Sequence, residues 1–81
     1  SSVALQFDPP WDETFDREAL LARTRRTLAL LPEAYRSALV GRYWDKRSTL
    51  DMALLAGKTA KSMERLLARA REQFKKRWID G

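Results

Sequence analysis

The sequence predicts an all-α fold, a compact four-helix domain within a chain of 81 residues. Apolar residues recur at steps of three and four over most of the chain, the spacing that places them on one side of an α-helix. Ser48, Gly57 and Thr59, residue types typical of helix ends, divide the later half. A chain of this length forms at most one domain with a modest core, for which a helical bundle is economical.

Residues 1–11 show no sustained period, and Pro9–Pro10 favours an extended backbone there. We expect residues 1–14, the acidic leader, to be a linker from a preceding domain. Its Phe7 and Trp11 could pack back on the helices or dock on a partner, or the segment could be a mobile tail. Residues 15–81 are expected to form the helical domain.

Two helices are expected in the first half of the domain. The first, over residues 12–31, begins with acidic residues and carries arginines later, which suits the helix dipole. Pro32 ends it and can take the first position of a second helix, over residues 32–44. We expect Tyr43 and Trp44 to be core aromatics, because base-stacking platforms usually lie on sheets or loops. The expected inner faces carry Phe15, Leu20, Leu21, Thr24, Leu28 and Leu31, then Tyr35, Ala38, Leu39, Arg42 and Tyr43.

The second half predicts a short helix, a sharp turn and a long basic helix. Ser48 is a suitable N-cap for the short helix, and the charge of Asp51 suits its positive end. Gly57 ends it, because glycine enters the left-handed conformation without steric cost. Thr59 then caps a helix over about residues 59–78, after which the tail should fray. Its apolar stripe comprises Met63, Leu66, Leu67, Ala70, Phe74 and Trp78.

A short helix, a glycine turn and a basic helix form the layout of a helix-turn-helix, whose second helix enters the major groove of DNA. The net charge of +5 is unevenly spread. Residues 1–22 hold five acidic residues and one basic residue, whereas residues 23–81 hold the other 15 basic and 6 acidic residues. A basic body indicates either a polyanionic partner or a solubilising surface.

Other classes of function are disfavoured. The chain has no cysteine and no histidine, so we expect no enzyme, metal site or cofactor. Gly57-Lys58-Thr59 is similar to the end of a phosphate-binding loop, but Met52 stands where that loop needs glycine. No apolar run approaches the ~18 residues that span a membrane. The basic helix comes with three others that form a core, which disfavours an isolated membrane-surface or calmodulin-target helix.

A series of short motifs spans residues 31–71, and they fall in the register of a known family without an insertion or deletion. In order, they are Leu31-Pro32-Glu33, Arg42-Tyr43, Ser48, Asp51-Met52-Ala53, Gly57, Thr59 and Arg69-Ala70-Arg71. This combination resembles region 4 of bacterial sigma factors, of the extracytoplasmic-function type, and the resemblance covers roughly residues 20–78. No single motif is specific, but the leucine-proline-glutamate start together with the arginine-alanine-arginine end is fairly specific.

The resemblance implies a sequence-specific DNA-binding domain in the bacterial cytoplasm. Such a domain recognises the −35 promoter element through the helix over residues 59–78 and docks on the β flap of core RNA polymerase. It is monomeric, and an anti-sigma factor commonly binds it. We expect base-edge contacts from Lys61, Ser62, Glu64, Arg65 and Arg69, and phosphate contacts from Arg36, Arg47, Ser48, Lys58 and Thr59.

Four positions depart from the family pattern, which affects the turn and the base preference. Ala56 replaces a usual leucine, Lys58 a usual aliphatic residue, and Arg47 an often apolar one. Glu64 stands where a basic residue is common; it would repel phosphate or accept from a cytosine amino group. Two alternatives therefore stay open. One is a response-regulator-type transcription factor that dimerises through its last helix, and the other is a protein-interaction module that no longer reads DNA.

Overall fold

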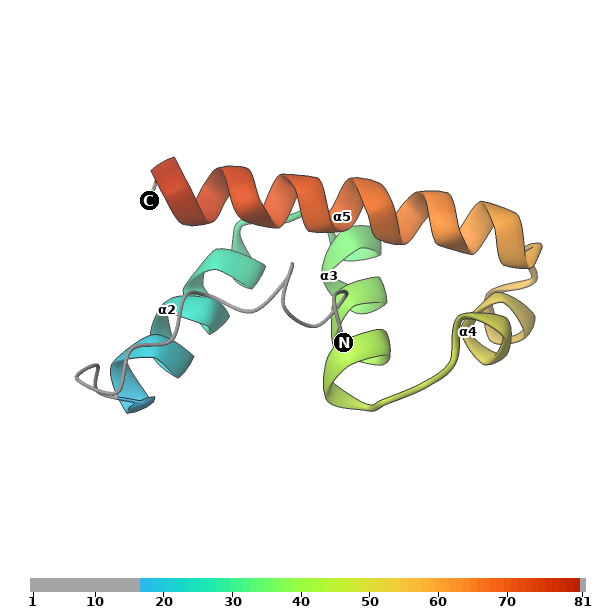
Figure 1. Ribbon diagram of the computed structural model, residues 1–81, viewed down its shortest axis with the longest axis horizontal. Coiled ribbons are helices and arrows are strands. Elements are labelled where there is room, and N and C mark those ends of the chain that lie inside the picture. Colours follow the sequence, from blue (N-terminus) through green and yellow to red (C-terminus); the bar gives the residue numbers. More distant parts are fainter. Residues whose placement is uncertain (1–16, 81) are drawn as a thin grey trace.

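The computed structural model describes residues 17–80, in which four α-helices and one π-helical turn follow one another without a strand. Figure 1 shows the last helix lying across the other three. The prediction of an all-α helix-turn-helix fold is confirmed. The acidic leader, residues 1–14, and Phe15 lie outside the described residues. The elements are α2 (Arg17–Ala29), α3 (Glu33–Leu39), η1 (Val40–Trp44), α4 (Thr49–Ala56) and α5 (Ala60–Asp80).

Helix α2 ends at Ala29, two residues earlier than predicted. The helix ends in a tighter turn, in which the backbone N–H groups of Leu30 and Leu31 donate to carbonyls three residues back instead of four. Pro32, which disfavours helical geometry in the residue before it, explains why the helix does not continue. Leu31 is nevertheless buried in the core, as predicted from its spacing. The other predicted inner residues of α2 are buried or half-buried, namely Leu20, Leu21, Thr24 and Leu28.

The second predicted helix is present but changes type along its length. After Leu39 it widens into the π-helical turn η1, in which the N–H of Asp45 donates to the carbonyl of Val40 at 3.0 Å. Lys46 follows with a φ of 60°, a left-handed conformation that is uncommon outside glycine. Tyr43 packs against the core, but Trp44 is 46% exposed, so the prediction of a core aromatic was wrong for Trp44. The widened turn directs Trp44 to solvent.

Helices α4 and α5 begin where the sequence predicted. The hydroxyl oxygen of Ser48 accepts from the backbone N–H of Asp51, and that of Thr59 accepts from Ser62, both at 3.0 Å. Gly57 ends α4 with a φ of 68°. These caps fix both sides of the turn between the two helices.

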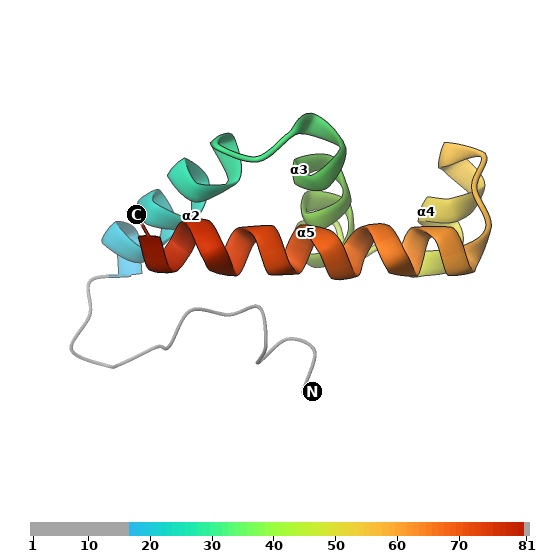
Figure 2. The same cartoon turned by 90° about the horizontal axis from the view of Figure 1, so that it is seen from above.

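The core lies where α5 crosses the other helices. Met63, Leu67, Ala70 and Phe74 are buried along one side of α5, as the predicted stripe requires. In Figure 2, α2 lies beside the C-terminal part of α5, α3 beside its middle and α4 beside its N-terminal part. Leu28, Leu31, Ala38, Leu39, Met52 and Ala53 complete this cluster.

The C-terminal end of α5 is held in place. The ring of Trp78 stacks on Phe74 with ring centroids 5.8 Å apart, and the Arg23 guanidinium lies over the Trp78 ring. The expectation that the tail frays from Trp78 was wrong, since α5 is helical through Asp80. A cation over an aromatic ring and a charged hydrogen bond, both from α2, give the physical reason.

Candidate nucleic-acid interface

The turn between α4 and α5 is built by backbone hydrogen bonds. The N–H of Lys58 donates to the carbonyl of Ala53 at 2.8 Å, and the N–H of Gly57 donates to that of Leu54 at 3.3 Å. This pair of bonds is the Schellman arrangement, which satisfies carbonyls left open at a helix end. A Cβ at Gly57 would meet nothing within 4 Å, so the positive φ alone explains the glycine. Lys58 and Thr59 are therefore presented at a fixed, exposed corner.

Three cations form a row along the exposed side of α5. Lys61, Arg65 and Arg69 are all exposed, and their spacing of four residues places them on one face. The face lies away from the buried stripe of Met63 and Leu67. A row of this kind, starting in the first turn of a helix, matches the part of a recognition helix that meets base edges. The structure thus brings together three of the five residues predicted to contact bases.

The other two predicted base-contact residues flank this row. Glu64 is exposed and lies one helical turn after Lys61 and next to Arg65 in the sequence. Ser62 is half-buried, and its backbone N–H is taken by the Thr59 hydroxyl. The side chain of Glu64 therefore brings a negative charge to a surface that is otherwise cationic, where it selects against phosphate and suits an amino group.

The residues predicted to contact phosphate gather at the two helix starts, with one exception. Arg47, Ser48, Lys58 and Thr59 are all exposed. The hydroxyls of Ser48 and Thr59 accept from backbone N–H groups, which leaves each hydroxyl proton available for donation to an anion. Together with the open N–H groups of the first turn, Thr59 forms the kind of helix end that binds phosphate.

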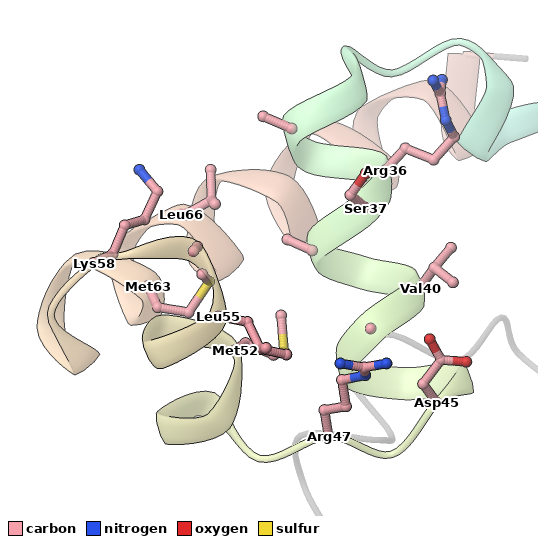
Figure 3. A pocket seen from close by; sticks show the side chains of 14 residues that line it. Arg36, Ser37, Val40, Asp45, Arg47, Met52, Leu55, Lys58, Met63 and Leu66 are labelled. Carbon is pink, nitrogen blue, oxygen red and sulfur yellow. The ribbon is translucent and has the colours of Figure 1, made fainter.

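Arg36 is the exception. It is half-buried, and its guanidinium donates to the backbone carbonyl of Leu31 at 3.1 Å, on the connection from α2 to α3. Figure 3 shows its nitrogen atoms directed toward that connection and away from Lys58. This bond gives Arg36 a structural role, and its contact with phosphate stays a prediction.

Arg71 is also engaged within the domain. Its guanidinium donates to the hydroxyl of Tyr43 at 3.3 Å, which links α5 to η1. Arg71 is half-buried, so two of the short motifs seen in the sequence, Arg42-Tyr43 and Arg69-Ala70-Arg71, meet in the structure.

A groove of about 660 Å³ opens between α3, η1, α4 and the start of α5, and the sequence did not predict it. Its deep part holds the buried methionines Met52 and Met63, and its walls include Val40, Leu55 and Leu66. Figure 3 shows Lys58 and Arg47 on opposite sides of these apolar side chains. We call this feature the methionine groove.

One sequence signal bears on part of this groove. Helix α4 is apolar nearly all round, and Leu50, Leu54 and Leu55 remain 59–71% exposed although Met52 and Ala53 are buried. A short helix with apolar residues on every side has more apolar surface than one core contact can cover. Of these three leucines, Leu55 lines the groove.

Residues 17–74 match the family model described as sigma-70, region 4, and this match covers more than two thirds of the chain. No curated protein and no solved structure matches the chain significantly. Within residues 17–80, no helix is both long and apolar enough to cross a membrane. The matched residues include the whole helix-turn-helix and the first fifteen residues of α5.

Proposed function

This chain belongs to the sigma-70 region 4 family, and we propose on that basis that it recognises the −35 promoter element through α5 and docks on the β flap of core RNA polymerase. Family membership makes it a DNA-binding part of a sigma factor, with DNA and RNA polymerase as partners in general. The promoter element, the flap and the residues that touch them are the proposal. It replaces the alternative of a response-regulator-type factor.

The row of Lys61, Arg65 and Arg69 is the observation that supports base reading most strongly. All three side chains are exposed, and the neighbouring cap at Thr59 orients the helix start. Arginine and lysine make the commonest specific contacts in the major groove, with the O6 and N7 atoms of guanine. A promoter element with guanines at the matching positions is therefore the expected ligand.

Fluorescence anisotropy with labelled duplexes tests this part of the proposal. A library of candidate promoter duplexes and scrambled duplexes of equal length is titrated with the chain across a salt series. The expected result is a steep negative salt slope, about −0.9 per phosphate neutralised, together with higher affinity for some sequences. A steep slope that is the same for all duplexes would leave a basic domain without base reading. No binding at low salt would favour the protein-interaction alternative.

The methionine groove supports the second part of the proposal, docking on the flap. It offers Val40, Leu55 and Leu66 as apolar walls, and residues of the helix-turn-helix line it, but the cation row of α5 does not. An apolar groove between helices fits an amphipathic helical segment of a partner. The apolar walls are separate from the base-contact row, but the rim cations Arg47 and Lys58 are also predicted phosphate contacts. The two partners would therefore bind adjoining surfaces of one domain that meet at these two residues.

Binding of a purified β flap domain, measured by calorimetry, tests the docking. Leu55→Asp introduces a charge into the groove wall and should abolish measurable binding of the flap domain. Leu50→Asp is a matched control, because Leu50 is an exposed leucine of the same helix that does not line the groove. Equal loss in both variants, or in neither, would count against the groove as the docking site. An anti-sigma factor that covers the same groove would show the same pattern.

We further propose that the domain is monomeric. Phe74 is buried, and the ring of Trp78 is occupied by Phe74 and Arg23, so these aromatics are not an open dimer seam. Sedimentation equilibrium should give the mass of a single chain, 9.4 kDa, at micromolar concentration. A concentration-dependent mass near twice that value would contradict the proposal.

A further inference from the structure

The methionine groove and the acidic leader have complementary chemistry within one chain. The groove has apolar walls, and its rim carries Arg36, Arg47 and Lys58 against a single acid, Asp45. The leader carries three acids, no basic residue, and several large apolar residues. We infer that the leader docks in the methionine groove of its own chain, with Phe7 and Trp11 as apolar anchors and its carboxylates near Arg47 and Lys58.

The apolar part of this inference rests on the walls of the groove. Leu55 is 71% exposed, and Val40 and Leu66 are half-buried beside it, so the groove presents apolar surface that the described residues leave uncovered. A volume of about 660 Å³ is in the range of pockets that enclose a small ligand, so it can hold aromatic side chains. Phe7 and Trp11 are the two aromatic residues of the leader. Aromatic residues are favoured anchors in such contacts because they bury much apolar area with few rotatable bonds.

The electrostatic part rests on the rim. Figure 3 shows Arg47 and Lys58 on either side of Met52, Leu55 and Met63, and both cations are exposed. Asp8, Asp12 and Glu13 stand on both sides of Trp11 in the sequence. An anchor flanked by acids therefore matches an apolar groove flanked by cations. Opposite charges at a rim chiefly set orientation and salt dependence, whereas the apolar contact supplies most of the affinity.

The leader is long enough to reach the groove. The leader precedes Arg17, the first described residue of α2, and α2 lies beside the C-terminal part of α5 (Figure 2). Arg23 contacts Trp78, which lies fifteen residues along α5 from Met63, a helical distance of about 22 Å. Arg23 lies six residues, or about 9 Å, into α2 from Arg17, so a path along α2 and α5 measures about 31 Å. The ten residues from Phe7 to Asp16 span up to about 33 Å when extended, so Phe7 can reach the methionines. The six residues from Trp11 to Asp16 span about 20 Å, so Trp11 reaches only the outer part of the groove. Pro9–Pro10 favours an extended backbone in this interval.

Docking of the leader has a consequence for polymerase binding, and this consequence rests on the proposed function. A leader that occupies the groove competes with the β flap for the same apolar walls. The affinity of the flap would be reduced by the fraction of molecules in which the groove is free. If the leader is docked in nine of ten molecules, its removal should tighten flap binding about tenfold. The leader would then act as a built-in competitor that the polymerase displaces.

The full 81-residue chain offers an unusually direct test, because it contains two methionines, Met52 and Met63, and both line the groove. A spectrum of ¹³C-labelled methionine methyl groups therefore has two signals, and both report on this site. The chain has no cysteine, so Gln6→Cys provides one attachment point for a nitroxide beside Phe7. Docking should broaden both methyl signals strongly. The broadening should decrease in the triple variant Asp8→Asn, Asp12→Asn, Glu13→Gln and in Phe7→Ala, Trp11→Ala.

A nitroxide on Ile79→Cys is the matched control, because Ile79 is exposed and lies about 24 Å along α5 from Met63. Equal methyl intensities with the label at position 6 and at position 79 would overturn the inference. Broadening that grows with protein concentration would overturn it too, because it would assign the groove to a second copy. The measurement contains neither DNA nor polymerase, so it is independent of the proposed function. Flap binding without leader docking would leave the proposed function intact, and leader docking without flap binding would remove only the docking on the flap.

Discussion

The guanidinium of Arg23 lies 4.1 Å from the ring centroid of Trp78 and donates a hydrogen bond to the backbone carbonyl of the same residue. The two residues are 55 positions apart, and one side chain of α2 thus holds both the ring and the main chain at the end of α5. The two hydroxyls buried in α2, on Thr24 and Thr27, donate within that helix. Arg23 therefore makes a polar connection from α2 to α5, whereas Thr24 and Thr27 do not.

We predict that Arg23→Ala destabilises the domain by about 2 kcal/mol, since it removes a cation–π contact and a charged hydrogen bond from a half-buried site. Urea unfolding followed by helical circular dichroism measures this change. Arg25→Ala is the control, because Arg25 is an exposed arginine of the same helix, and it should stay within about 0.5 kcal/mol of the parent. Equal effects of the two substitutions would show that the contact with Trp78 contributes little.

The turn at Gly57 yields a second prediction. Gly57→Ala should cost about 1 kcal/mol, because alanine is strained at a φ of 68° even though its Cβ has open space. Gly41→Ala serves as the comparison, since its Cβ would make only an ordinary contact, 3.5 Å from the Met52 methyl carbon. Thermal unfolding should therefore rank Gly57→Ala as clearly the less stable variant. A reversed order would mean that the left-handed conformation is not what requires glycine at 57.

Thr59 allows stability and DNA binding to be separated. Thr59→Asp preserves an oxygen that can accept from the N–H of Ser62, and its charge suits the helix start, so stability should be unchanged or slightly higher. The same charge repels a phosphate at this helix end, so affinity for DNA should fall by at least tenfold at low salt. Unfolding and anisotropy on the same preparation give both numbers. An unaltered DNA affinity would remove Thr59 from the interface.

The exposed cations should divide into two functional classes. Arg65→Ala should reduce discrimination at one base position by about 1–3 kcal/mol, because it removes a contact to a base edge. Lys58→Ala should weaken binding to all duplexes alike and reduce the salt slope by about one, as expected for a lost phosphate contact. A panel of duplexes with single base changes, titrated at several salt concentrations, distinguishes the two. Uniform weakening by Arg65→Ala would reassign that residue to the phosphate contacts.

Local chemistry explains why the helix-turn-helix could be predicted so closely from the sequence. Ser48, Gly57 and Thr59 act through atoms within a few residues of themselves, so their spacing alone places the caps and the turn. The buried stripe of α5 followed from helical periodicity in the same way. The row of cations opposite that stripe could be predicted for the same reason.

The features that the sequence did not reveal depend on long-range contacts. No local motif in the sequence encodes the π-helical turn η1 or the exposure of Trp44. The pairs Arg23–Trp78 and Arg71–Tyr43 join residues distant in the chain. Arg36 shows the same limit, because its bond to the Leu31 carbonyl gives a basic residue a structural role. The methionine groove combines residues of four elements, and of the exposed leucines of α4 only Leu55 lines it, so the pattern of α4 alone does not locate it.

Helix α5 is a single unbroken rod, so the contacts that hold its C-terminal end also affect the position of its N-terminal end. From Trp78 to Lys61 the axis measures about 26 Å, so α5 acts as a lever whose far end carries the first cation of the row. A pivot of about 5° at the anchored end would sweep Lys61 through about 2 Å, which is enough to break a hydrogen bond. The orientation of the N-terminal end of α5 is thus set in part at its C-terminal end, by an arginine and a tryptophan far from where a base would lie.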